Sequence, residues 1–234
     1  MDLILSLKFP FDDQDWLKKI AIGSLLLITI IGSVAVVGWM IEIARRVIDG
    51  HPEPLPAWND IGQFFIDGLK FMGVTFLWSL PIILVILGFA LGQAITLSAA
   101  EQTPTQLPLQ LFPLFFLICL FPLIMVFNAV LYLALPGIVA LLAIDTRFWQ
   151  VANPSHVFGL IRKSWVSFVI AGLLGWLGIN STAGLVGMFL CVVGVIPATV
   201  YVYAVNGHLA GQAFIEANKP NNAPLPPVSY NFPP

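Results

Sequence analysis

Charged residues are scarce in this chain, at 9% of its 234 residues, whereas an ordinary soluble domain has roughly 25%. Apolar residues make up 59% of the sequence, and a water-soluble fold of this size could not cover its surface with so few charges. The long uncharged stretches are typical of a chain surrounded by lipid. They predict an all-α fold, a polytopic bundle of transmembrane helices.

Basic runs, metal-ligand spacings and paired cysteine motifs are also missing. The net charge is −2, and no run of Lys and Arg is longer than two residues, so the electrostatic footprint of a nucleic-acid-binding protein is absent. Cys119 and Cys191 lie singly in apolar stretches and are interpreted as small buried hydrophobes. These absences predict no nucleic-acid partner, no metal and no cofactor, although a lipid or pigment could still be bound.

The segment before the first apolar tract mixes apolar and acidic residues. Asp12, Asp13 and Asp15 stand where a cleavable signal peptide would have basic residues leading into an apolar core. We therefore expect the first membrane helix to serve as an uncleaved insertion signal.

Apolar tracts of sufficient length predict five or six membrane segments. A hydrocarbon core of about 30 Å requires roughly 20 apolar residues in a helix. The predicted spans are residues 20–43, 71–97, 109–129, 131–146, 164–180 and 183–206, in one membrane domain of residues 1–217. Residues 218–234 hold six prolines and are predicted to be extended or disordered.

The number of spans depends on the third apolar region. Residues 109–144 contain three prolines and are too long for one straight pass. We favour two passes that meet near Asn128 over one tilted helix. By the positive-inside rule, five spans place the N-terminus outside and six place it inside, and Lys and Arg divide seven against three in both cases.

Two amphipathic segments are predicted to lie in the headgroup region. In the first, over residues 58–70 and the residues that follow, the apolar face consists of Trp58, Ile61, Phe65, Leu69 and Met72. A short helix packed on a neighbouring loop is the alternative. The second segment starts at Asn153 and Pro154, which are typical of a helix N-cap and of the first helical position.

The centres of the predicted spans contain no ionisable residue, which argues against a proton-coupled carrier and against an intramembrane aspartyl protease. No catalytic motif is present, so no enzyme is predicted. Neutral polar side chains remain at Gln93, Asn128 and Asn206. They are interpreted as hydrogen-bonding groups between helices, and the alternative is the polar lining of a pore.

Small residues recur at a spacing of four, which is typical of close contacts between membrane helices. The pairs are Gly88 and Gly92, Ala171 and Gly175, Ala183 and Gly187, and Gly207 and Gly211. They are interpreted as packing faces within the bundle or toward a partner. Contacts at the interface or with a partner are predicted for Arg45, Arg46, Trp58 and Trp165.

One charged group is the best candidate for a functional face, although a solvated helix end is the simpler interpretation. Its members are Glu42, Arg45, Arg46 and Asp49, with Asp60 and Asp67 nearby in the sequence.

Three parts of the chain resemble a known family. Residues 9–19, residues 43–50 with 55–70, and residues 206–212 are similar to the opening, middle and closing segments of the domain-of-unknown-function family 4013. The resemblance extends to about Ala217 and implies a prokaryotic polytopic membrane protein without a known reaction or known catalytic residues. It also implies a plasma-membrane location or, for a cyanobacterial chain, a thylakoid location.

These observations lead to a functional hypothesis. We predict a non-catalytic accessory, assembly or structural subunit of a larger membrane complex, with the bilayer and a membrane protein or a second copy as partners. The alternative is a small-solute permease or channel with proline-broken helices, lined by Gln93, Asn128 and Asn206. A lipid-modifying enzyme that uses His51, Glu53 and Asp60 ranks third.

Overall fold

The computed structural model describes residues 1–51, 55–100, 118, 120–144, 147–173, 175, 181, 185 and 194–219. Within these residues the secondary structure is helical and contains no β-strand, so the all-α prediction is confirmed. The chain divides into two compact units. The first comprises Met1–Val74 and Tyr132–Pro234, and the second is Thr75–Leu131.

The first unit begins with short helices. α1 (Leu3–Lys8) is followed by the 3-10 helix η1 (Phe9–Asp12), and then by α2 (Trp16–Leu27) and α3 (Ile30–Asp49). The prediction of one continuous span over residues 20–43 is wrong. The chain breaks at Thr29, which is extended and whose hydroxyl accepts a hydrogen bond from the Gly32 amide at 3.0 Å, so it starts a new helix as an N-cap.

α3 ends with a glycine at its C-cap. Gly50 follows its last residue in a left-handed conformation with φ 69°. The amides of Gly50 and His51 donate to carbonyl oxygens of the last turn. Glycine adopts this conformation without steric cost, which makes it the usual residue after a helix C-terminus.

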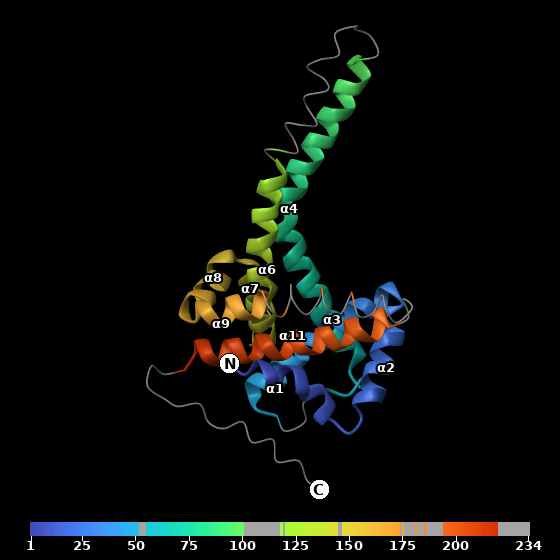
Figure 1. Ribbon diagram of the computed structural model, residues 1–234, viewed down its shortest axis with the longest axis vertical. Coiled ribbons are helices and arrows are strands. Elements are labelled where there is room, and N and C mark those ends of the chain that lie inside the picture. The colour runs from blue at the N-terminus through green and yellow to red at the C-terminus, as the bar shows by residue number, and fades with distance from the viewer. Residues whose placement is uncertain are drawn as a thin grey trace. The chain divides into compact units, whose positions relative to one another are not determined.

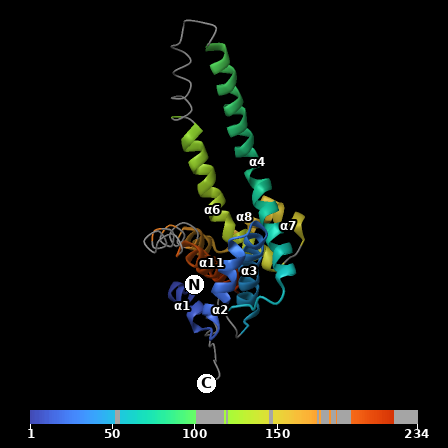
Figure 2. The same cartoon turned by 90° about the vertical axis from the view of Figure 1, so that its right-hand side faces the viewer.

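α3 is the buried centre of the first unit. α11 (Val195–Ala217) lies along it, and α2 packs against both helices (Figures 1 and 2). The approach of α11 is close: a Cβ added at Gly207 would lie 2.4 Å from the carbonyl oxygen of Met40, and one at Gly211 would lie 2.9 Å from that of Ala44. The structure thus places this predicted small-residue pair against a helix of the same chain.

The first turns of α4 (Ile61–Ala100) cross α3 at a second pair of glycines. A Cβ added at Gly38 would lie 1.7 Å from the carbonyl oxygen of Phe64, and one at Gly68 would lie 1.9 Å from that of Val34. Both obstacles are main-chain atoms, which no side-chain rotation can move. This crossing therefore depends on glycine at both positions.

Two tryptophans join α3 to the segment before α4. Trp39 and Trp58 stack with ring centroids 5.0 Å apart. The Trp39 Nε1 donates to the Pro56 carbonyl at 3.0 Å, and the Trp58 Nε1 donates to the Lys19 carbonyl at 2.8 Å. Trp58 is consequently a core residue, and its prediction as an interface anchor is corrected.

α4 continues through residue 71 without a break, so the separate amphipathic helix predicted over residues 58–70 is wrong. Its buried side chains in the first turns are Phe64, Asp67, Phe71 and Val74, while Ile61, Leu69 and Met72 are exposed. The predicted apolar face is therefore mostly the outer one. In a membrane protein both the lipid-facing and the protein-facing sides are apolar, so periodicity alone does not distinguish them.

The described part of the second unit contains the later residues of α4 and the start of α6 (Phe121–Ile144). α6 passes Asn128 without interruption, and the Asn128 amide donates to the Ile124 carbonyl of the same helix at 2.9 Å. The division into spans 109–129 and 131–146 is therefore wrong. Pro122 is the second residue of α6. Residues 109–117 lie outside the described residues.

Two described helices are long and apolar enough to cross a membrane, Ile61–Ile95 and Phe121–Ile144. After α7 (Phe148–Ala152), α8 (Pro154–Lys163) and α9 (Trp165–Ile170) follow. α8 and the segment Trp165–Leu173 are bent by 108° and make a third candidate if the pair counts as one span. The Asn153 side chain caps α8 as predicted. Most of residues 176–193, within the predicted spans 164–180 and 183–206, and residues 220–234 of the tail lie outside the described residues.

Candidate functional site

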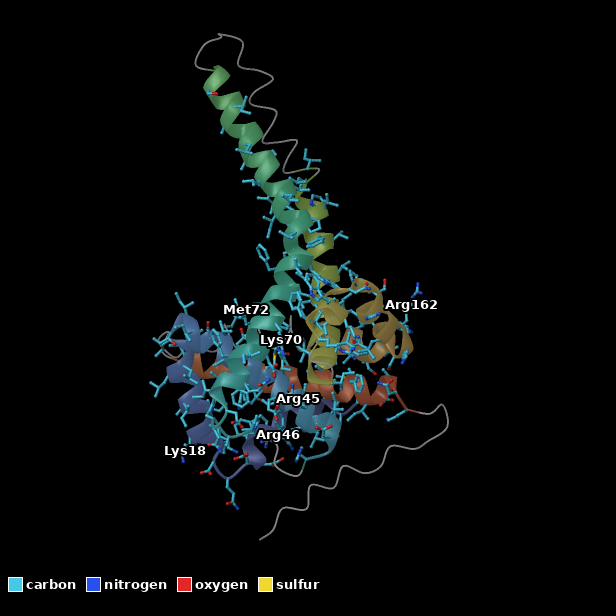
Figure 3. All side chains as sticks on the ribbon, turned by 180° about the vertical axis from the view of Figure 1, so that it is seen from behind. Lys18, Arg45, Arg46, Lys70, Met72 and Arg162 are labelled. Atoms are coloured by element: carbon cyan, nitrogen blue, oxygen red, sulfur yellow. The ribbon has the colours of Figure 1, made fainter. Side chains whose placement is uncertain are left out.

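Charged residues of α3 and α4 come together around Arg45. Its Nη2 donates to Asp67 Oδ2 at 3.2 Å, its Nε donates to the Ala143 carbonyl at 3.0 Å, and its Nη1 pairs with Glu42. One guanidinium thereby joins α3 to α4 and to the C-terminal end of α6. Figure 3 shows Arg45, Arg46 and Lys70 in this region.

Asp67 is the buried acid of this network, with 3% of its side chain exposed. Besides Arg45, its Oδ1 accepts hydrogen bonds from Lys70 Nζ and from Gln63 Nε2, each at 3.2 Å. A carboxylate can be buried at moderate cost only when its lone pairs are satisfied in this way. Arg46 lies at the rim and pairs with Glu42 at 3.5 Å.

A shallow open pocket of about 140 Å³ borders the network. It is lined by Glu42, Arg46, Ala57, Asn59, Asp60, Gln63 and Phe64. The lining carries both signs of charge and could hold a small polar group, but it is well below the roughly 300 Å³ of an ordinary ligand site. Asp49 is exposed, so the predicted charged face is chiefly a set of contacts between helices with a small open rim.

The comparison with protein families decides where this chain belongs. A family model described as "Protein of unknown function (DUF4013)" matches residues 21–211. The chain is a member of the DUF4013 family. No curated protein and no solved structure matches it. The family assignment agrees with the resemblance predicted from the sequence.

A second polar cluster in this DUF4013 protein joins α1 and η1 to α11. His208 is 1% exposed, its Nδ1 lies 2.9 Å from Ser6 Oγ, and its ring stacks on Phe9 at 4.3 Å. Burial lowers the pKa of His208 to about 4, against the opposite influence of the nearby Asp2. The imidazole is therefore neutral at pH 7. In the sequence, only its position near the end of an apolar tract could have indicated this role.

Acidification is expected to weaken this contact. The folded-state pKa of about 4 lies below the ordinary value of 6.5, so the unfolded chain takes up the proton first. The stabilisation that depends on neutral His208 is complete above the unfolded-state pKa and is lost as the pH falls toward the folded-state pKa. The total loss is about 3 kcal/mol. We expect the unfolding temperature in detergent to fall less steeply between about pH 7 and about pH 4.5 for His208→Gln than for the natural chain.

The exposed His156 provides the matched control, because His156→Gln removes a histidine outside the contact between Ser6 and His208. If the unfolding temperatures of His208→Gln and of the natural chain fell equally with pH, the lowered pKa of His208 would be contradicted.

The other small residues predicted to pack have different surroundings. Ala171 is buried in a cluster with Val205 and Leu209 of α11. A Cβ added at Gly175 would lie 2.7 Å from Asn206 Oδ1. Gly88 has open space around it among the described residues, and Gly92, on the same helix, is half-buried. Ala183 and Gly187 lie outside the described residues.

The neutral polar residues are divided between the two units. Gln93 and Asn128 belong to the second unit and Asn206 to the first. Asn206 is 1% exposed, and its amide atoms have no hydrogen-bond partner among the described residues. No group of three or more His, Cys, Asp or Glu side chains in the described part of the chain could hold a metal ion.

Proposed function

We propose that this DUF4013 protein is a non-catalytic integral membrane protein that acts as an accessory or assembly subunit of a larger complex. The observation that carries the proposal is that α4 is both strongly apolar and largely exposed. The most apolar window of Ile61–Ile95 has a mean hydropathy of 2.4, and 6% of it is buried within the chain. A helix that is so apolar and so exposed needs hydrocarbon or another apolar surface around it.

The exposed side of α4 also has room for another helix. Its exposed apolar side chains include Leu84, Leu87, Leu91 and Ile95. Gly88 lies among them in the sequence, with open space beside it in the described structure. In lipid, a glycine on an otherwise bulky face allows a second helix to approach closely. The proposed occupant of this face is a helix of a partner membrane protein or of a second copy.

The polar chemistry of the described residues supports a structural role. The Asp67 carboxylate is occupied by Arg45, Lys70 and Gln63, and His208 is buried beside Ser6. These groups hold helices together, and the open pocket beside them is small. A catalytic site would instead need reactive side chains with access to a substrate.

We further propose which segments cross the membrane. α4 and α6 each cross it, and the bent pair α8 and α9 enters it. The membrane is the prokaryotic plasma membrane or, in a cyanobacterium, the thylakoid membrane. Cysteines placed at Asp13 and Lys219 and labelled from either side of intact membranes would test the resulting topology.

Association through α4 can be tested with Gly88→Ile. In mild detergent the natural chain is expected to migrate on a native gel as a complex above monomer size. Gly88→Ile should shift it to the monomer without lowering its unfolding temperature, because the added side chain meets open space among the residues that the structure describes.

The matched control is Gly62→Ile, since Gly62 also faces open space but lies in the first turn of α4. This variant should leave the complex intact. A natural chain that migrates at monomer size without a co-purifying protein would contradict the proposal.

The alternative function, a small-solute permease, has one observation in its favour. The Asn206 amide is 1% exposed and has hydrogen-bonding capacity that no described residue uses, which a polar solute could take up if the helices around it moved apart. Flux of small polar solutes into vesicles that contain the purified chain, and its loss in Asn206→Leu, would favour this alternative over the subunit role.

A further inference from the structure

The bend between α8 and α9 places basic residues where an apolar helix begins. α8 ends with Arg162 and Lys163, Ser164 forms the bend with φ −145° and ψ 60°, and α9 starts at Trp165. The chain direction changes by 108° at this point. An amphipathic helix that turns into an apolar one in this way is typical of the boundary between headgroups and hydrocarbon.

One face of α8 packs against the rest of the protein, and the opposite face is exposed. Val157 and Leu160 are buried, and Val157 contacts the α6 backbone at Gly137, where an added Cβ would lie 3.1 Å from its Cγ1. On the outer side Phe158 is 40% exposed, and Trp165 beyond the bend is 64% exposed. The bend is thus anchored on its inner face, and the exposed Trp165 lies where the aromatic belts of membrane proteins place such a ring.

The charge of this region has one sign. Between Arg147 and Ile215 the sequence contains Arg147, Arg162 and Lys163 but no Asp or Glu. The Arg162 side chain makes no hydrogen bond or ion pair with any residue that the structure describes. Figure 3 shows it at the outer edge of α8 and α9. Lys163 donates to Asn218 at 3.4 Å, and none of the ion pairs seen in the described part of the chain involves it.

We propose that the α8–α9 bend binds the headgroup phosphate of an anionic phospholipid. The Arg162 guanidinium contacts the phosphate oxygens with two parallel N–H donors, and Lys163 adds a second positive charge. Trp165 lies at the level of the glycerol backbone, where its ring is half in hydrocarbon. Lipid fits this site better than an acidic peptide in water, because a peptide would leave the exposed tryptophan in contact with solvent.

The inference rests on the membrane location within the proposed function, but it does not require a partner protein. It can therefore be tested on the purified full chain in vesicles of phosphatidylcholine and phosphatidylglycerol. The bromine quencher is placed on the acyl chains of either lipid at the same mole fraction. Tryptophan fluorescence should be quenched more by brominated phosphatidylglycerol than by brominated phosphatidylcholine, because the anionic lipid collects beside Trp165.

Variants locate the effect on the bend. The excess quenching should be lost in Arg162→Gln/Lys163→Gln. It should be reduced in Arg162→Lys, because lysine keeps the charge but lacks the paired N–H donors of the guanidinium. The control Lys8→Gln/Lys18→Gln removes the same charge from two exposed positions of the first unit and should retain the full excess.

Each other outcome overturns the proposal. Equal quenching by the two lipids would show no preference for the anionic headgroup. An excess that survives in Arg162→Gln/Lys163→Gln, or disappears equally in the control, would place the effect elsewhere or on general surface charge. If the chain does not float with the vesicles, the membrane location itself fails. Flotation without a lipid preference removes the lipid site alone.

Discussion

Alanine at Gly38 is expected to destabilise the protein by about 3 kcal/mol, at the upper end of the cost of overpacking. The added methyl group would lie 1.7 Å from the Phe64 carbonyl oxygen. Neither atom belongs to a side chain that can rotate away, so α3 and α4 would have to separate along their crossing. The free energy of unfolding in detergent, measured by denaturant titration, would show the loss.

Two further variants make this prediction specific to the crossing. Gly68→Ala should destabilise to a similar extent, and the double variant by less than the sum, since both methyl groups force the same separation. Gly88→Ala should instead be neutral or stabilising by up to about 1 kcal/mol, because alanine favours the helix and no described residue lies within 4 Å of the added methyl group. A Gly38→Ala protein as stable as the natural chain would refute the close crossing.

Removal of the Arg45 side chain is expected to have the other large effect. Arg45→Ala leaves the buried Asp67 carboxylate without its guanidinium partner and the Ala143 carbonyl without its donor. Leaving one member of a buried pair uncompensated costs about 3 kcal/mol or more, of which Lys70 and Gln63 offset a part. A lowered unfolding temperature in detergent is the measurement.

The neighbouring arginine provides the matched control. Arg46→Ala removes a pair at the rim, at 3.5 Å from Glu42, and should cost at most about 1 kcal/mol. Asp67→Asn in the Arg45→Ala background should restore part of the lost stability, because it removes the uncompensated charge. If Arg45→Ala and Arg46→Ala lost the same stability, pairing with the buried Asp67 would not be what makes Arg45 important.

Both effects concern α3, and they explain why a helix predicted to lie in lipid is instead the centre of the first unit. α11 approaches it at Gly207, α4 approaches it at Gly38, and Arg45 ties its C-terminal half to α4 and α6. Most apolar side chains of α3 after its first turn are buried against other helices, whereas Ile30 and Ile31 in the first turn are exposed. The apolar window of α4, by contrast, is largely unburied, with 6% of it buried within the chain.

Composition and local chemistry alone determined the all-helical class, the membrane-crossing length of α4 and several helix ends. Scarcity of charge excludes a water-covered surface for such long apolar tracts, whatever their packing. Gly50 ends α3 and Asn153 caps α8 because the conformation and the hydrogen bond involve only neighbouring residues. The family resemblance was likewise carried by short segments, and the family match over residues 21–211 agrees with it.

Tertiary structure decided which apolar face is buried, where helices break and which polar groups meet. Trp58 and Leu69 are both apolar, yet one is in the core and the other is exposed, because hydropathy does not report what the neighbouring surface is. The glycine crossing at Gly38 and Gly68 and the pairing of His208 with Ser6 join residues far apart in the chain. Such contacts depend on the relative placement of whole helices, which no local pattern encodes.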